Sequence, residues 1–93
     1  MRKIERTTAF ARDFKREKQS GRHANLDSVL SEVVTLLVND RPLAIKNHDH
    51  PLAGEWQGFR ECHLRPDLLL IYRKLEEQTL HLVRMGSHSE LFD

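Results

Sequence analysis

The feature that most constrains the fold is the segment 68–75, which opens with five apolar residues in succession, Leu68-Leu69-Leu70-Ile71-Tyr72. A strand with one solvated face is apolar only at every second residue. A continuous run therefore predicts a strand covered on one face and partly on the other. Strands are also predicted at 57–64, where the pattern is mixed, and at 79–84, where apolar residues alternate. Turn residues separate the three segments, so we expect an antiparallel meander with 68–75 at its centre.

An amphipathic helix is predicted ahead of the meander. Phe10 and Phe14 are four residues apart and share one helix face, while the basic side chains fall mostly on the other. Thr7 or Thr8 can cap the start of this helix, because a hydroxyl oxygen accepts a bond from a free backbone N–H. Gly21 is expected to end it.

A second helix is predicted from a stripe of apolar residues at the i, i+3, i+4, i+7 spacing, namely Leu26, Val29, Leu30, Val33 and Leu37. Asn25 is its expected cap, and the segment 39–42, which ends in Pro42, stops it. With a short edge strand at 2–6, an ordered loop at 42–56 and a short tail at 87–93, the predicted order is β-α-α-β-β-β. The sequence thus predicts an α+β fold, a two-helix hairpin on a four-stranded, mainly antiparallel sheet whose other face is open.

Size and composition are typical of one globular domain spanning residues 1–93. The chain is 39% hydrophobic and 31% charged, and no apolar run approaches the roughly 20 residues of a membrane span. The N-terminus lacks the apolar core of a signal peptide. Cys62 is the lone cysteine, which fits a reducing compartment, and it is expected to be a small residue within a strand rather than a nucleophile. We therefore expect a cytoplasmic protein without membrane partners.

The formal net charge of +1 hides an asymmetry. Residues 1–22 carry eight Lys or Arg against three Asp or Glu, a net +5, and the remainder of the chain carries −4. A basic N-terminal helix suits a polyanion such as RNA, and Lys15 and Arg16 are its candidate contacts. A solvated helix face is the alternative interpretation.

Histidines are the candidate catalytic groups. His48, His50, His63 and His88, together with Asp67, fall in predicted loops or near strand ends. Imidazole can both accept and donate a proton near neutral pH. RNA cleavage needs both steps, because one group deprotonates the ribose 2′-OH and another protonates the departing 5′ oxygen. Arg60 and Arg84 could stabilise the charge that develops on the phosphate.

Two further features bear on the binding of ligands. His48-Asp49-His50 suggests a metal site, but its spacing fits the usual zinc patterns poorly, so we expect neither metal nor cofactor. Trp56 and Phe59 could stack on bases or pack in the core. Phe92, four residues after His88, is a candidate base contact.

Together these residues form a recognisable pattern in three blocks: Asp49-His50-Pro51-Leu52-x-Gly54-x-Trp56-x-Gly58-Phe59-Arg60, then His63-x-x-Pro66-Asp67 followed by Leu70-Ile71-Tyr72, then Arg84-x-Gly86-Ser87-His88-Ser89-x-Leu91-Phe92. The pattern resembles the YafQ branch of the RelE-like toxins. The match is dense over residues 42–93. Across 1–41 it rests on the order and character of the elements.

The resemblance implies a metal-independent, ribosome-dependent mRNA endoribonuclease, the toxin of a type II toxin–antitoxin pair. It implies the catalytic set His50, His63, Asp67 and His88, with Phe92 beside a base. His50 or His63 would be the base, Asp67 would orient a histidine, and His88 would be the acid. The implied partners are a cognate antitoxin of the DinJ or RelB kind, mRNA in the ribosomal A site, and operator DNA only through the antitoxin.

Two departures and three alternatives accompany the resemblance. Leu68 stands where such toxins often carry an aromatic residue, and Met85 where a small polar one is usual. ParE-like toxins share the architecture but inhibit DNA gyrase and lack the histidine set. The second alternative is a plain RNA-binding or ribosome-binding module in which the histidines are incidental. The third is a metalloprotein.

Overall fold

The computed structural model describes residues 1–92, which form a five-stranded sheet in the order β1-β5-β4-β3-β2. The strands are β1 (Lys3–Arg6), β2 (His50–Pro51), β3 (Arg60–Arg65), β4 (Leu68–Leu75) and β5 (Thr79–Gly86). The helices are α1 (Thr8–Ser20), α2 (Leu26–Val38) and α3 (His88–Phe92), with short 3-10 turns η1 (Ile45–Asn47) and η2 (Gly54–Trp56). All neighbours are antiparallel except β1 and β5, which are parallel.

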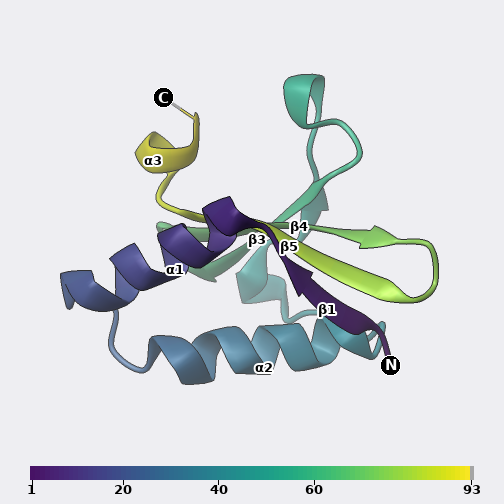
Figure 1. Ribbon diagram of the computed structural model, residues 1–93, viewed down its shortest axis with the longest axis horizontal. Coiled ribbons are helices and arrows are strands. Elements are labelled where there is room, and N and C mark those ends of the chain that lie inside the picture. The colour runs from purple at the N-terminus through teal and green to yellow at the C-terminus, as the bar shows by residue number, and fades with distance from the viewer. Residues whose placement is uncertain (93) are drawn as a thin grey trace.

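Strand β4 is the central strand, as predicted. Every residue from Leu68 to Tyr72 is at most 1% exposed. Leu68, Leu70 and Tyr72 belong to the core cluster, while Leu69 and Ile71 alternate with them and so point to the other face. In Figure 1, α2 lies below the sheet, and α3 and the η2 loop project on the opposite side. Burial of each large apolar side chain contributes roughly 1.5–3 kcal/mol, which explains why this run fixes the centre of the fold.

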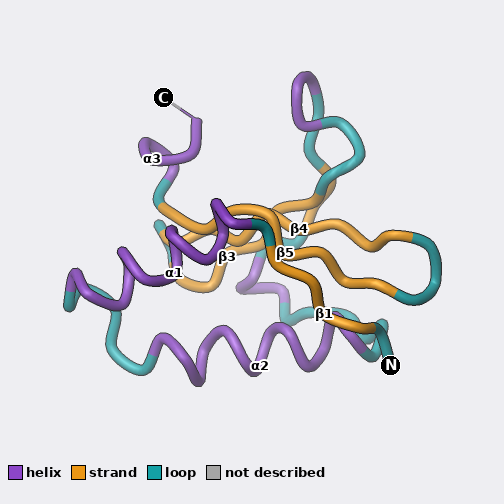
Figure 2. Tube along the Cα trace, in the orientation of Figure 1, coloured by secondary structure: helices purple, strands orange, loops and turns teal. Residues whose placement is uncertain are grey.

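The two long helices follow their predicted patterns. Thr7 caps α1 by accepting the N–H of Phe10 at 2.9 Å, and Gly21 ends it with φ 72°. Phe10 is buried and Phe14 packs beside it in the core. The predicted stripe of α2 also faces the core, which confirms the helical hairpin. The tube in Figure 2 shows the two helices joined by a short loop.

Several details correct the sequence prediction. The sheet has five strands rather than four, because His50–Pro51 pairs with β3 inside the predicted 42–56 loop. The predicted 87–93 tail contains α3, and Asp93 lies outside the described residues. Asn25 does occupy the cap position of α2, but its φ is 57° and its side chain makes no capping bond. The α+β class, the hairpin and the mainly antiparallel sheet are confirmed.

A buried carboxylate joins α1 to β5. Asp13 is 3% exposed and accepts bonds from Arg84 at 2.6 Å and from the backbone N–H of Met85 at 3.0 Å. Burial alone would raise the pKa of Asp13, but these bonds and the Arg84 and Arg16 charges outweigh it, so the pKa is lowered. The helix is thus locked to the strand by an ion pair rather than by apolar contact alone.

Two single findings complete the fold. Cys62 is fully buried, and burial raises the pKa of its thiol to about 12, which confirms that it is a core residue rather than a nucleophile. No helix among residues 1–92 is long and apolar enough to cross a membrane.

Replacing Asp13 tests the lock between α1 and β5. Asp13→Asn leaves Arg84 without its carboxylate, and we expect the free energy of unfolding at pH 7 to fall by about 3 kcal/mol in urea titration. The exposed Asp27→Asn change, which removes only a surface pair with Lys18, should cost under about 0.5 kcal/mol.

The stability difference between the wild type and Asp13→Asn should depend on pH. Because the folded-state pKa of Asp13 is lowered, its contribution is fully present above the ordinary carboxyl pKa of about 3.9 and is lost as pH falls through the lowered value. The stability difference between the wild type and Asp13→Asn should therefore shrink below about pH 4. A difference that stays constant from neutral pH to pH 3 contradicts the assignment.

Candidate active site

Pairing between strands places the candidate residues on the sheet face opposite the core. His63 lies opposite Leu69, and Glu61 lies opposite Ile71, so all four side chains share one face. The neighbouring core face takes Cys62 and Leu70 instead. An alternating strand therefore delivers a buried carboxylate and an imidazole to the same surface.

The register between β4 and β5 brings the end of the chain to this surface. Leu69 pairs with Gly86, so the turn that contains Asp67 lies beside the start of α3. Asp67 Oδ1 accepts the backbone N–H of His88 at 3.1 Å and lies 2.8 Å from the ring Nδ1 of His88. The backbone bond and then the ring bond lower the pKa of Asp67. His88 is thus held by a carboxylate while more than half of its side chain stays exposed.

A second imidazole–carboxylate pair forms at the other end of the cluster. His50 pairs with Glu61 across β2 and β3, and His50 Nε2 lies 2.9 Å from Glu61 Oε2. The preceding residue, Asp49, accepts the Tyr72 hydroxyl at 2.5 Å and lies 3.3 Å from Arg60. Burial first, and then the bond to Asp49, raise the pKa of Tyr72. Asp49 is therefore an anchor for the strand that presents His50.

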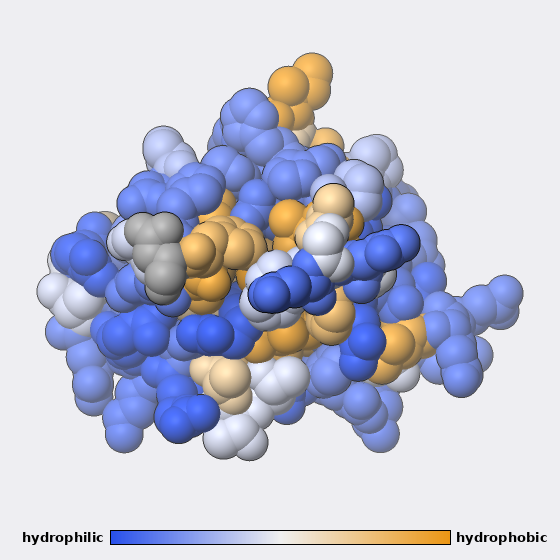
Figure 3. All heavy atoms as spheres, turned by 90° about the horizontal axis from the view of Figure 1, so that it is seen from above, coloured by the Kyte–Doolittle hydropathy of each residue, from blue (hydrophilic) through white to orange (hydrophobic). Residues whose placement is uncertain are grey.

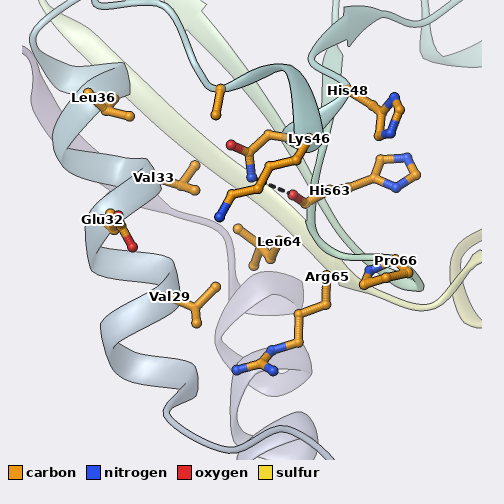
Figure 4. A pocket seen from close by; sticks show the side chains of 12 residues that line it. Val29, Glu32, Val33, Leu36, Lys46, His48, His63, Leu64, Arg65 and Pro66 are labelled. Atoms are coloured by element: carbon orange, nitrogen blue, oxygen red, sulfur yellow. Dashed lines mark hydrogen bonds between the residues drawn. The ribbon is translucent and has the colours of Figure 1, made fainter.

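His63 stands between the two pairs. Its ring centroid is 5.1 Å from that of His48 and 5.7 Å from that of His88, and its Nε2 is 3.9 Å from Glu61 Oε2. The buried Asn47 donates to the His63 carbonyl at 2.8 Å and so ties η1 to β3. Figure 4 shows this bond, with the His48 and His63 rings side by side at the end of a groove of about 680 Å³ that runs along α2.

The aromatic candidates form one cluster beside the histidines. Trp56 makes edge-to-face contacts with Phe59 at 5.4 Å and with Phe92 at 6.3 Å between ring centroids. The Arg73 guanidinium covers the Phe59 ring at 4.7 Å. Phe92 is 41% exposed, whereas Trp56 and Phe59 are half-buried. The view from above in Figure 3 shows apolar side chains gathered within a mostly hydrophilic surface on the side that carries α3 and η2.

The predicted basic contacts differ in their surroundings. Arg84 is paired with Asp13, and Arg16 contacts Asp13, Glu17 and Glu90 and donates to the Met85 carbonyl. Arg60 is paired with Asp49 and keeps 40% of its side chain exposed. Lys15 is exposed on α1. These pairs explain the positions of Arg16 and Arg84, and direct RNA contact by the basic set stays a prediction.

Comparison with known proteins identifies the family. A family model described as a bacterial toxin of type II toxin–antitoxin systems, YafQ, matches residues 2–93. The chain belongs to the YafQ family. The mRNA interferase toxin YafQ of Escherichia coli K12 is 39% identical over 92 residues, which is 98% of this chain and 96% of that protein. The predicted resemblance is confirmed, and so is the predicted class of enzyme, an endoribonuclease toxin.

Solved structures of YafQ-like toxins share the fold. A metal-bound toxin from Helicobacter pylori is 49% identical with a TM-score of 0.87, and the match covers 99% of this chain and 100% of that one. E. coli YafQ in its complex with DinJ is 38% identical with a TM-score of 0.84, and the match covers both chains completely.

The structure of this YafQ-family chain brings His50, His63, Asp67 and His88 into one cluster, as the sequence pattern predicted. It adds two groups that sequence reasoning left out, the buried Glu61 and the anchor Tyr72. Glu61 could have been found, because a strand over 60–65 puts it on the same face as His63. From the sequence, Tyr72 is predicted only as a core residue, because the hydrogen bond from its hydroxyl to Asp49 depends on the fold.

The position of His88 depends on a capping box at the start of α3. Ser87 Oγ accepts the Glu90 N–H at 3.1 Å, and Glu90 Oε1 accepts the Ser87 N–H at 2.8 Å. This bond from the Ser87 N–H lowers the pKa of Glu90. Gly86 leaves room for the arrangement, because a Cβ there would come within 3.1 Å of both Arg16 and Glu90.

Removing one half of the capping box should loosen α3. Glu90→Ala is expected to cost about 1 kcal/mol locally, because the Ser87 N–H loses its partner. In NMR spectra, the amides of Ser87 and His88 should shift toward random-coil values and exchange faster with solvent. Glu77→Ala, at an exposed position in the β4–β5 turn, is the matched control. Unchanged amides in Glu90→Ala would contradict the role of the box.

Proposed function

We propose that the chain is a ribosome-dependent mRNA endoribonuclease that uses the ribose 2′-OH as nucleophile and needs no metal for the chemistry. The observation that carries this proposal is the row of imidazoles flanked by two carboxylates, in which His63 stands between the His88–Asp67 pair and the His50–Glu61 pair. Such a row supplies both an acid and a base within reach of one phosphodiester.

The proposed reaction is a transesterification. His50 or His63 removes the proton from the 2′-OH, and the 2′ oxygen attacks the adjacent phosphorus. The bond to the 5′ oxygen breaks, and His88 donates a proton to that oxygen as it leaves. The products are a 2′,3′-cyclic phosphate and a 5′-hydroxyl. Base and acid catalysis of this kind contribute about 10²–10⁴-fold each.

The carboxylates support these proposed roles within the cluster. Asp67 accepts both the backbone N–H and the ring Nδ1 of His88, which stabilises the protonated ring that an acid needs. Glu61 faces both His50 and His63 and would stabilise whichever ring takes the 2′-OH proton. A carboxylate that holds an imidazole in this way orients the ring and stabilises its charged form.

RNA contact is proposed at the aromatic cluster and at the exposed basic groups. Phe92 offers a ring face for a base, and stacking on an aromatic ring contributes about 1–3 kcal/mol. Trp56 makes an edge-to-face contact with Phe92. Arg60 is the candidate that would stabilise the charge developing on the phosphate, since it lies at the start of β3, pairs with Asp49 and keeps 40% of its side chain exposed.

The proposed partners follow from the family. E. coli YafQ forms a complex with DinJ, so an antitoxin of the DinJ or RelB kind is proposed to bind this chain and to supply the operator-binding element. The ribosome with mRNA in its A site is the proposed substrate complex. A cytoplasmic location is proposed, since that is where translating ribosomes are.

The proposal is tested by expressing the wild type and His50→Ala, His63→Ala and His88→Ala from a tightly repressed promoter and mapping 5′ ends on a reporter mRNA. We expect growth arrest with new 5′ ends inside codons, and at least one hundredfold fewer of them in the substituted forms, at the lower bound of about 10²–10⁴ for acid or base catalysis. A reporter without its start codon should remain intact.

His81→Ala is the matched control, because His81 lies on β5 outside the cluster, and it should cleave like the wild type. Arrest that persists in all three cluster variants would contradict the catalytic assignment and favour a binding toxin of the ParE kind. Cleavage of the untranslated reporter would contradict ribosome dependence.

A further inference from the structure

Arg16 lies where helix α1, the end of β5 and helix α3 meet. Its guanidinium contacts an acceptor on each of these elements, Asp13 Oδ1 at 3.0 Å, the Met85 carbonyl at 3.1 Å and Glu90 Oε2 at 3.3 Å. A Cβ on Gly86 would come within 3.1 Å of the same guanidinium, so Arg16 packs directly against the segment that connects β5 to α3. Arginine suits this position, because its planar group offers several N–H donors in a fixed arrangement.

The buried carboxylate of Glu17 fixes the orientation of Arg16. Glu17 is 1% exposed, and its Oε2 accepts a hydrogen bond from Arg16 Nε at 3.0 Å. Its other oxygen accepts from Arg22 at 3.4 Å. Burial alone would lower the pKa of Arg16, but the bond to Glu17 and the charges of nearby carboxylates outweigh it, so the pKa is raised. The guanidinium is thus held in one place although 42% of the side chain is exposed.

Glu90 divides its two oxygens between two partners. Oε1 accepts the Ser87 N–H at 2.8 Å within the capping box, whereas Oε2 faces Arg16. Arg22 adds a second cation, 3.8 Å from the same Oε2. The capping box sets the first turn of α3, which begins at His88. Glu90 therefore links Arg16 on α1 to the helix turn that carries His88.

Helix α3 depends on its polar contacts for its position. None of its residues from His88 to Phe92 is buried, so it gains little from apolar packing. The bond to Asp67 holds the His88 ring at one end of the helix, and Phe92 joins the aromatic cluster at the other. The pair of Glu90 with Arg16 holds the backbone between these two ends.

We propose that Arg16 is a positioning residue for RNA cleavage, which through Glu90 holds α3 so that His88 can protonate the departing 5′ oxygen. The role of His88 rests on the proposed function, whereas the positioning of α3 by Arg16 does not. Acid catalysis depends on such placement, because a misplacement of about 1 Å can lower a rate by about 10²-fold. A direct contact of Arg16 with RNA, as expected from the sequence, is the alternative that the experiments separate from positioning.

NMR spectra of the full chain test the positioning of α3 without reference to activity. Arg16→Gln removes the guanidinium, and we expect the amide signals of Ser87 and His88 to shift and these amides to exchange faster with solvent. Arg2→Gln is the matched control, because Arg2 also pairs with a carboxylate, Asp40 at 2.9 Å, and donates to backbone carbonyls. It lies near the N-terminus, far from α3 in Figure 1, so it should leave both signals in place. Unchanged signals in Arg16→Gln would overturn the proposal.

Glu90→Gln separates the ion pair from the capping box and keeps the proposal testable should Arg16→Gln fail to fold. Glutamine is a normal capping-box residue, so its oxygen can still accept the Ser87 N–H. Its NH₂ group then faces Arg16 in place of a carboxylate oxygen, and two donors meet. We expect Glu90→Gln to shift the His88 amide as Arg16→Gln does, and the double variant to add little, because both changes break one link. Wild-type signals in Glu90→Gln would show that the cap alone fixes α3 and would overturn the role of Arg16.

Cleavage of mRNA on programmed ribosomes tests the consequence for His88. We expect the maximal rate of Arg16→Gln to fall by about 10–100-fold, while the toxin concentration that gives half of the maximal rate stays unchanged. An mRNA with sulfur in place of the 5′-bridging oxygen at the cleavage site should be cut by Arg16→Gln at nearly the wild-type rate, because a thiolate leaves without an acid. Arg2→Gln should cleave both substrates like the wild type.

The outcomes distinguish positioning from RNA contact. A salt-dependent rise in the half-maximal concentration of Arg16→Gln, with an unchanged maximal rate, would assign Arg16 to RNA and overturn the proposal. Equal slowing on both substrates would overturn it as well, since a general loss of structure does not spare the sulfur substrate. If the α3 amides shift in Arg16→Gln but His88→Ala cleaves the oxygen substrate like the wild type, the positioning of α3 stands and the proposed acid is refuted.

Discussion

The pairing of β4 with both of its neighbours is the constraint on which the rest of the structure depends. Its first five residues are buried on both faces, so β3 and β5 must flank it in a fixed register. A shift by one residue would turn Leu69 and Ile71 into the core and expel Leu68 and Leu70. In that register Leu69 pairs with His63 of β3 on one side and with Gly86 of β5 on the other. Side chains from three distant segments meet there as a consequence of strand burial.

Carboxylates contact the imidazoles that this register brings together. Asp67 holds His88, Glu61 faces His50 and His63, and Asp13 locks α1 to the strand that leads into α3. Each acts from a different environment, since Asp67 is exposed whereas Glu61 and Asp13 are buried.

Much of this could be predicted from patterns along the chain. The run Leu68–Leu75 gave the central strand with its correct bounds, and the stripe of α2 gave the helical hairpin. Strand β2 could not be predicted, because a two-residue strand with a proline has no periodicity and forms only through its pairing with β3. Helix α3 was missed although Ser87-x-x-Glu90 is a capping-box signal. Family motifs identified the histidines, but the role of Glu61 depends on a cross-strand partner and on burial, which no local pattern records.

The most direct test of the central claim asks whether His88 protonates the leaving group. The substrate is an mRNA with a single 5′-bridging sulfur at the cleavage site, placed in the A site of a programmed ribosome, because a thiolate leaves without a proton. The account predicts that His88→Ala is slowed by about 10²–10⁴-fold on the oxygen substrate but cleaves the sulfur substrate at nearly the wild-type rate. His63→Ala or His50→Ala, whichever removes the base, should stay slow on both. If His88→Ala is equally slow on both substrates, His88 is not the acid and the account is wrong at its centre.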